Sequence, residues 1–439
     1  MLTSQTRTPI AALGEKIGAC VRVCGLVQAL RDQKRMQFLV LADATGEAQI
    51  VHDKVSGEDP LAAQIAGLTP GSAVAVTGRV LAAPSVKLGG LEIAAETLEL
   101  HSLAETPLPI AADSALEKQI DWRALSLRRP EQRLVFQVQT TLEAAMRDWW
   151  RARGFIELHS PKLMGTFSES GAEAFKVAYF GERTAYLAQS PQFYKQMAMA
   201  AGFERVFEIG PAFRAEPSFT PRHETEFTSL DMEMAWTEDH HELMAIEEAW
   251  LTHALARVAE AHGAEIRERL GIEVRAPTAP FPKVTLAEAQ KIVRASGHLP
   301  TKSDDLDPES ERRLGAHIAR ETGSPFVFVT DYPASARAFY HRRHPDRQDL
   351  TQSFDLLMGG IEITTGAQRE HRYEMLRAQA IERGYALEPL QPYLDFFRYG
   401  CPPHGGMGVG LARVLMALLG RSSVRETTLI SRTPTRLLP

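Results

Sequence analysis

The first hundred residues of this chain form a series of short segments that alternate like β-strands, with no long helical segment among them. The segments are residues 19–30, 36–42, 46–52, 73–82 and 91–100. Residues 43–46 supply turn-forming side chains between the second and third segments. Many short strands without a long helix predict a small β-barrel for this region.

The pattern changes near Pro130. From residue 131 to 153 apolar side chains recur at helical spacing, and Gly154 follows where a helix C-cap belongs. Later segments are strand-like at 186–188, 206–209, 230–236, 325–330 and 354–363, and helical at 240–261 and 406–419, the last opening with a Gly-rich turn.

A chain of 439 residues is too long for one compact core, so we expect at least two domains. We predict a barrel over residues 1–104, a hinge with Pro107 and Pro109 over 105–130, and an α/β domain over 131–439. Residues 262–324, which are charged and Ala-rich, are interpreted as an insertion into the second domain, with plain solvated surface as the alternative.

Composition limits the class of protein. The chain is 44% apolar and 24% charged, which is typical of a soluble globular protein, and no apolar run approaches the ~20 residues that cross a bilayer. The N-terminus lacks the features of a secretory signal, so we expect a cytoplasmic protein without a membrane partner. Cys20, Cys24 and Cys401 do not form a zinc-ligand pattern and are interpreted as reduced structural thiols. The net charge of -6 argues against a nucleic-acid coat protein but leaves room for a local basic footprint.

Three stretches carry residues suited to chemistry. The first, residues 154–163, is a glycine, a strand and Pro161, which also fits a helix cap followed by a strand edge. The second places Arg214, Arg222 and His223 in one loop, and arginine is the preferred partner of phosphate because its planar fork binds two oxygens. A solvated hairpin tip is the alternative for that loop. The third is the glycine-rich run 406–410, which leads into an apolar helix with Arg413 in its first turns.

In this order the three stretches resemble motifs 1, 2 and 3 of class II aminoacyl-tRNA synthetases. The matching residues are Pro161, then Arg214 with Glu216, then Gly410 with Arg413. Five strands are the count of the OB fold, and an OB-like barrel ahead of the motifs narrows the resemblance to the synthetases for aspartate, asparagine and lysine. The runs 167–175, 186–196, 354–370 and 399–413 resemble aspartyl-tRNA synthetases of the short archaeal and eukaryotic type.

The resemblance implies a fold and a reaction. The fold would be an OB barrel followed by a class II catalytic domain, an antiparallel sheet flanked by helices. The α-carboxylate of aspartate would attack the α-phosphorus of ATP, and the aspartyl group would then pass to the 3′ hydroxyl of tRNA, without a protein nucleophile. Positioning and charge stabilisation would carry the rate. Motif 1, with residues 155–163, would build a homodimer interface.

The resemblance also implies the residues of each site. Arg214, Glu362 and Arg413 would be catalytic, and Glu362 with Thr365, where the family usually has serine, would hold Mg²⁺. Aspartate would be bound by Glu169, Gln192, Phe193, Tyr194, Lys195, Arg214, Thr365 and Arg369. ATP would be bound by Arg214, Ala215, Glu216, Arg222, His223, Glu224, Phe227, Glu362, Gly410, Leu411, Ala412 and Arg413.

The amino acid and the tRNA depend on fewer residues. Lys195 and Arg369 facing one pocket would demand an acidic substrate, because unpaired buried cations are costly. In the barrel, Arg31, Phe38 and Gln49 stand where the family reads the anticodon, with barrel core as the alternative for Phe38. Pro84 resembles enzymes that charge the asparagine tRNA as well as the aspartate tRNA.

Three alternatives differ in class. One is an asparaginyl enzyme, and another is a paralogue that makes aspartyl-adenylate for an acceptor other than tRNA, against which the intact barrel argues. The last is a non-catalytic RNA-binding protein, which predicts loss of the phosphate-binding residues. Arg214, Arg222, Glu362 and Arg413 are all present.

Overall fold

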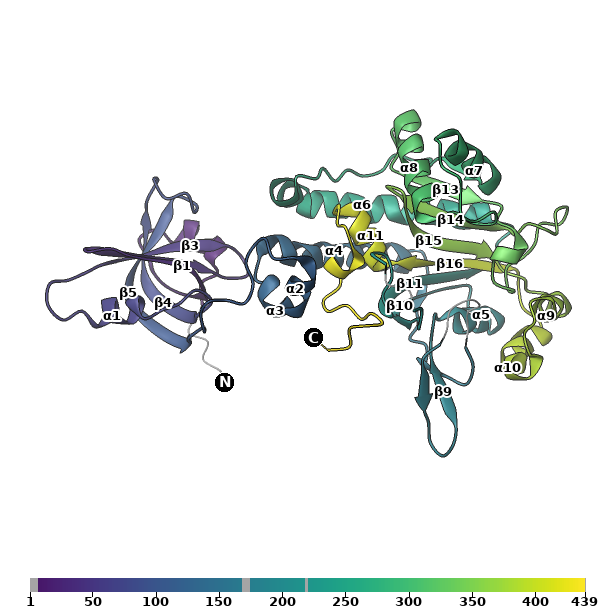
Figure 1. Cartoon of the computed structure of the whole chain (residues 1–439), viewed down its shortest axis with the longest axis horizontal. Coiled ribbons are helices and arrows are strands. Elements are labelled where there is room, and N and C mark those ends of the chain that lie inside the picture. The colour runs from purple at the N-terminus through teal and green to yellow at the C-terminus, as the bar shows by residue number, and fades with distance from the viewer. Residues whose placement is uncertain (1–6, 168–173, 218–219, 439) are drawn as a thin grey trace. The chain divides into compact units, whose positions relative to one another are not determined.

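The computed structural model describes residues 7–167, 174–217 and 220–438, and the chain divides into two compact units, Met1–Ala115 and Leu116–Pro439 (Figure 1). No helix among these residues is both long and apolar enough to cross a bilayer.

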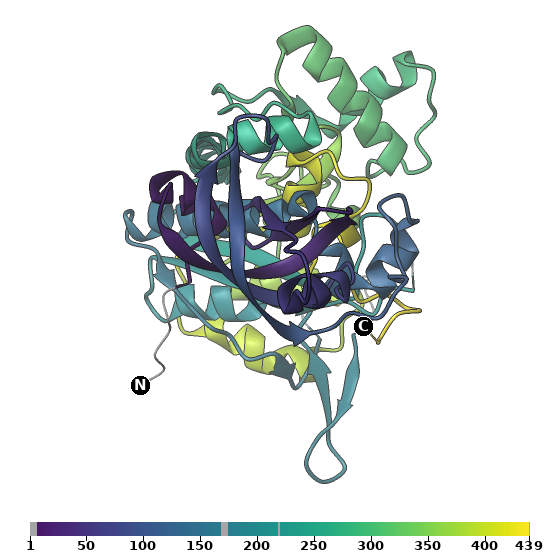
Figure 2. The same cartoon turned by 90° about the vertical axis from the view of Figure 1, so that its left-hand side faces the viewer.

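The first unit is a closed five-stranded barrel (Figure 1, Figure 2). Its strands follow the order β1-β2-β3-β5-β4 around the barrel, with a short helix α1 after β3. Their bounds are β1 Cys20–Asp32, β2 Met36–Ala42, β3 Glu47–Asp53, α1 Pro60–Ala66, β4 Ala73–Ala82 and β5 Leu91–Ser102. Alternation in β2 explains the barrel core, because Leu39 and Leu41 are buried inside while Phe38 and Val40, which precede them, are only half-buried. The predicted OB-type barrel is confirmed.

The second unit is built on an eight-stranded sheet of order β12-β13-β14-β15-β16-β11-β10-β6. The strands are antiparallel except for the end pairs β12–β13 and β6–β10, which are parallel. Their bounds are β6 Ile156–Glu157, β10 Arg205–Phe213, β11 Glu226–Ala235, β12 Lys283–Thr285, β13 Phe326–Thr330, β14 Ser353–Met358, β15 Ile361–Gln368 and β16 His404–Gly410. A three-stranded sheet of β7 Leu163–Met164, β9 Thr184–Leu187 and β8 Lys176–Ala178 includes a hairpin that projects from this unit (Figure 1).

Helices cover both faces of the large sheet. α4 Pro130–Arg151, α6 His240–Leu270 and α11 Leu411–Leu418 pack into one apolar core with it. The helical repeat of apolar residues explains how α4 packs into this core, since Leu134, Val138 and Leu142 all lie on its buried stripe. α5 Gln192–Ala200, α9 Tyr373–Glu382 and α10 Leu387–Arg398 form a second apolar cluster.

Two segments differ from expectation. Part of the expected hinge forms the short helices α2 Leu116–Asp121 and α3 Arg123–Ser126. In the expected insertion, α6 continues to Leu270 and β12 joins the edge of the main sheet, followed by α7 Leu286–Ala295 and α8 Pro308–Thr322. The first part of that stretch is therefore continuous with the sheet and its covering helix.

The glycine-rich run was expected to form a turn. It instead forms the strand β16 in the middle of the sheet. A Cβ at Gly406 would lie 2.1 Å from the carbonyl oxygen of Met232 and 2.2 Å from a carboxylate oxygen of Glu233. Glycine lets the backbone approach these groups closely. The helix α11 follows directly, beginning at Leu411.

Candidate active site

A cavity of about 320 Å³ lies over β11, β15 and β16 in the second unit. Alternation in β11 forms its floor: Leu230 and Met232 are buried in the apolar core, while Ser229 and Asp231 line the cavity. Opposite them, Gly408 pairs with both Asp231 and Thr365, so these three residues form one row across the sheet. The glycines of β16 thus leave the space that the cavity occupies.

One end of the cavity is rich in arginine. Arg413, from α11, contacts Glu362 Oε1 at 3.2 Å and the carbonyl oxygen of Arg222 at 3.3 Å. Arg222 in turn pairs with Glu311 at 2.6 Å. Burial, followed by the charge of Arg413, lowers the pKa of His223, so this ring adds no charge at neutral pH. The arrangement suits a ligand with several negative oxygens.

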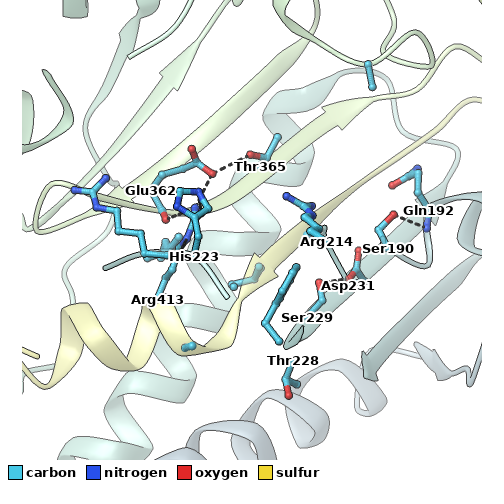
Figure 3. Close-up of a pocket in the computed structure, with 18 of the residues that line it drawn as sticks. Ser190, Gln192, Arg214, His223, Thr228, Ser229, Asp231, Glu362, Thr365 and Arg413 are labelled. Carbon is cyan, nitrogen blue, oxygen red and sulfur yellow. Dashed lines mark hydrogen bonds and ion pairs between the residues drawn. The ribbon is translucent and has the colours of Figure 1, made fainter. Parts of the chain in front are cut away.

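Arg214 lies between the two ends. In Figure 3, His223, Arg413 and Glu362 lie to one side of it, and Gln192 and Asp231 to the other. Its guanidinium is 5.4 Å from the centre of the Phe227 ring, and its Nε atom is buried with no hydrogen-bond partner among the residues described. An orphaned buried donor in a cavity wall is suited to bind a ligand oxygen.

The other end contains Arg369, which donates to Glu233 at 2.9 Å and to the side-chain oxygen of Gln192 at 3.2 Å. Gln192, at the start of α5, also lines the cavity. Because a carboxylate and an amide fix this guanidinium, it has a defined position. Recognition of a planar group on a ligand requires such a position.

Lys195 does not share the wall with Arg369, contrary to expectation. Its ammonium lies 2.7 Å from Asp231 Oδ1 and 3.4 Å from Glu233 Oε2, and only 2% of the side chain is exposed. The two cations are therefore each paired with a carboxylate from β11. The premise that they are unpaired cations facing one pocket is wrong.

The other expected site residues divide into three groups. Thr365, Glu216, Glu224, Phe227, Gly410 and Ala412 line the cavity together with the residues described above. Phe193, Tyr194, Lys195, Ala215 and Leu411 are not among the described residues that line it. Phe193 instead stacks on Tyr393 with ring centres 3.9 Å apart, because its side of α5 faces α10. Glu169 lies outside the described residues.

In the barrel, three expected residues share one outer face. Arg31 of β1 pairs directly with Phe38 of β2, and Gln49 of β3 pairs with Val40, two residues from Phe38. Directly opposed residues and residues two apart project on the same side of a sheet. Phe38 is not part of the buried barrel cluster, so a cation, a ring and an amide lie together on an accessible surface. Pro84 lies in the loop between β4 and β5.

Comparison with known proteins matches both units. Residues 115–434 match the family described as tRNA synthetases class II (D, K and N), and residues 21–100 match the OB-fold nucleic acid binding domain. The chain belongs to this synthetase family. Its members activate an amino acid with ATP and attach it to tRNA.

Relatives match the synthetase over nearly its whole length. An aspartate–tRNA(Asp/Asn) ligase of Aeropyrum pernix is 40% identical, covering 98% of each chain. An aspartate–tRNA(Asp) ligase of Thermococcus kodakarensis is 39% identical, covering 96% of this chain and 97% of its own. Among solved structures, the asparaginyl-tRNA synthetase of Pyrococcus horikoshii with asparaginyl-adenylate has a TM-score of 0.91 at 32% identity, covering 99% of this chain and 100% of that one. The aspartyl-tRNA synthetase of Entamoeba histolytica has a TM-score of 0.88 at 31% identity, covering 100% and 94%.

Sequence reasoning missed several cavity residues of the synthetase. Asp231 was detectable, because acidic residues alternate with apolar ones along β11. Arg337, Tyr340 and His341 also line the cavity, and they come from a segment without regular repeat between η2 (Ala334–Ala336) and β14. No periodic signal could have placed them there.

Proposed function

We propose that this synthetase activates L-aspartate with ATP and transfers it to tRNA(Asp), and to tRNA(Asn) as well. The observation that carries the proposal is the position of Arg369 in the cavity wall, fixed by Glu233 and Gln192, across from the arginine-rich end. The relatives from Aeropyrum pernix and Methanopyrus kandleri, named aspartate–tRNA(Asp/Asn) ligases, support the wider tRNA choice.

Each charged group of the substrates has a matching partner in the cavity. The α-phosphate of ATP and the α-carboxylate of aspartate would meet Arg214, whose buried Nε has no partner among the residues that the structure includes. The outer phosphates would meet Arg222 and Arg413. The aspartate ammonium would meet Asp231, and its side-chain carboxylate would meet Arg369. This is a complete complement for two anionic substrates.

The reaction then needs positioning more than acid–base chemistry. A carboxylate oxygen of aspartate attacks the α-phosphorus, and the bond to pyrophosphate breaks, so the pyrophosphate takes the electron pair. Cations that are already in place stabilise the charge that develops, without reorganising at the moment of reaction. The terminal ribose hydroxyl of tRNA then attacks the carbonyl of the adenylate and AMP leaves.

Magnesium fits this site through Glu362 and Thr365. The Thr365 hydroxyl lies 3.4 Å from Glu362 Oε1, and both supply hard oxygen ligands. The repulsion of neighbouring carboxylates also favours a cation here: after burial, the charge of Glu362 is the next cause that raises the pKa of Glu311, to about 7. Across the described residues no cluster of three or more His, Cys, Asp or Glu could hold a metal. Phosphate and water oxygens would complete the coordination, and the ion would neutralise phosphate charge.

We extend the proposal to assembly, location and domain limits. Residues 1–104 would bind the anticodon through Arg31, Phe38, Gln49 and Pro84. The synthetase would act as a cytoplasmic homodimer through residues 155–163, where Ile156 and Leu163 are large exposed apolar side chains. A monomer in light scattering at micromolar concentration would contradict the dimer.

Asparagine is the second candidate substrate, and two observations favour it. Lys195 does not line the cavity, and Arg369 is already paired with Glu233, so the positive charge facing the substrate is smaller than the sequence suggested. The close structural similarity to an asparaginyl-tRNA synthetase agrees with this reading.

Pyrophosphate exchange decides between the candidates. Purified protein with ATP and Mg²⁺ is assayed with aspartate, asparagine and lysine in separate reactions, with and without tRNA. We expect exchange with aspartate alone. Exchange with asparagine would identify the second candidate. Loss of all exchange would indicate a protein that no longer activates amino acids.

A further inference from the structure

His341 is a buried histidine in the wall of the cavity. It is 5% exposed, and its Nδ1 atom is buried with no hydrogen-bond partner in the described part of the chain. A buried ring nitrogen without a partner is costly in a native protein, and such a group calls for an explanation. A missing ligand is one explanation, because the same residue lines the cavity.

Backbone pairing places the His341 side chain next to that of Arg369. The two residues form an isolated antiparallel bridge. The flanking bonds run from the Arg342 amide to the Gln368 carbonyl and from the Glu370 amide to the Tyr340 carbonyl, both at 2.9 Å. This is the non-hydrogen-bonded type of pair, in which side chains on the same face come closest.

The backbone of His341 is held by two further hydrogen bonds. The amide of Gln379, on α9, donates to the His341 carbonyl at 3.1 Å, and the His341 amide donates to Ala338 at the same distance. The backbone of this residue is therefore fixed, as a binding residue requires.

Charge determines what the ring can bind. Burial, followed by the charges of Arg369, Arg337 and Arg383, lowers the pKa of His341 well below its usual value. The ring is neutral at pH 7 and has one N–H donor and one acceptor nitrogen. A group that binds between this donor and the Arg369 guanidinium must be rich in acceptor oxygens, and a carboxylate satisfies both.

We propose that His341 binds the side-chain carboxylate of the amino acid substrate through Nδ1, beside Arg369. The assignment rests on the proposed function, since it takes the substrate to be aspartate. It adds a second recognition group to the end of the cavity where the side chain of the substrate would lie.

The test uses aspartate-dependent pyrophosphate exchange by the full chain. For His341→Leu we expect the KM for aspartate to rise about 10- to 100-fold, as for one lost hydrogen bond to a charged group, while the KM for ATP stays within about twofold. His341→Asn places an amide group near the position of Nδ1, and we expect it to keep the aspartate KM within about fivefold. His341→Phe, which keeps the ring shape without nitrogens, replaces the leucine variant if that one does not fold.

His344 offers a matched control on the same segment. It pairs with Asp331 at 3.0 Å and is not among the described cavity residues, so His344→Leu should leave the aspartate KM unchanged. An unchanged KM in His341→Leu, or equal losses in His341→Leu and His341→Asn, would overturn the assignment and indicate packing or a bound water. Absence of aspartate-dependent exchange in the unaltered protein would contradict the proposed function itself, and the assignment with it.

Discussion

The ammonium group of Lys195 lies 2.7 Å from a carboxylate oxygen of Asp231, and both side chains are almost completely buried. Lys195 also approaches the carbonyl oxygens of Met232 and Met407, on β11 and β16. The lysine therefore ties α5 to two neighbouring strands of the sheet. Its charge is used inside the protein, between α5 and the sheet, and Lys195 is not among the described residues that line the cavity.

Replacing Lys195 should therefore reduce both stability and aspartate activation. Lys195→Met leaves the Asp231 carboxylate buried and unpaired, a change that typically costs about 3–5 kcal/mol. Urea denaturation should show that loss, and the KM for aspartate should rise. Lys302→Met is the control, because Lys302 pairs with Asp305 on the surface and should cost at most about 1 kcal/mol. Equal losses in the two variants would show that the Lys195 pair is not the buried contact described.

Replacing Arg369 should affect aspartate far more than ATP. Arg369→Gln removes the cation that pairs with Glu233 at 2.9 Å, and we expect a rise of about 100-fold or more in the KM for aspartate. Steady-state exchange with each substrate varied in turn measures this. Arg372→Gln is the control. It removes a nearby arginine that pairs with Glu370 and whose side chain is 53% exposed. A near-normal aspartate KM in Arg369→Gln would remove this residue from the site.

Phe38→Ala should weaken charging of tRNA and leave adenylate formation unchanged. The ring lies on the outer face of the barrel, and one base–aromatic stack is worth about 1–3 kcal/mol. Aminoacylation and pyrophosphate exchange, measured side by side, separate the two steps. Leu39→Ala is the contrasting variant, since Leu39 is buried in the barrel core and should instead lower stability. If Phe38→Ala slows both steps equally, the ring is not a tRNA contact.

Glu247 should make stability depend on pH. Its side chain is fully buried, and burial, followed by the charge of Asp355, raises its pKa from 4.5 to about 8. Between these values the folded protein holds a proton that the unfolded chain has released, so the free energy of unfolding falls as pH rises.

Glu247→Gln removes this titration. Relative to the unaltered protein, the variant should gain up to about 1.4 kcal/mol for each pH unit between about 4.5 and 8. Urea denaturation at several pH values measures the difference. Glu260→Gln, at an exposed position on the same helix, should show no such trend. Parallel curves for the Glu247 variant and the unaltered protein would mean that the buried carboxyl does not titrate in this range.

The tRNA choice should be relaxed. The two anticodons differ at one base, and one mismatched contact is worth about 1–3 kcal/mol, roughly a five- to hundredfold preference. Pro84 cannot donate a backbone hydrogen bond near that base, and Leu26 and Gln28 supply no aromatic surface. The ratio of kcat/KM for tRNA(Asp) and tRNA(Asn), at one salt concentration, is the measurement. A preference for tRNA(Asp) above about a thousandfold would show strict discrimination.

Periodic signals in the sequence predicted the elements that bury one stripe or one face. The repeat of α4 and the alternation of β2 are examples, because each side chain there meets the core at a regular interval. The arginine-rich end of the cavity was also predicted, since Arg214, Arg222 and Arg413 stand in recognisable motifs. Those parts depend on local pattern alone.

Contacts between distant segments were not predictable in this way. The glycines of β16 were interpreted as a turn, because nothing in the local sequence shows that Met232 and Glu233 occupy the space beside Gly406. The resemblance placed Lys195 in the aspartate pocket, and no local signal in the sequence shows its pairing with Asp231, 36 residues away. His341 lies in an irregular segment, and only the pairing with Arg369 brings it to the cavity.

The glycines of β16 limit how such a site can be redesigned. At Gly406 any side chain would collide with backbone and carboxylate atoms, and at Gly405 a Cβ would lie 2.7 Å from Leu243 and 2.9 Å from the Ala367 carbonyl. β16 is therefore closed to substitution at these two glycines, whatever substrate an engineer has in mind. New preferences must be introduced through other residues that line the cavity, such as Gln192, Thr365 and His341.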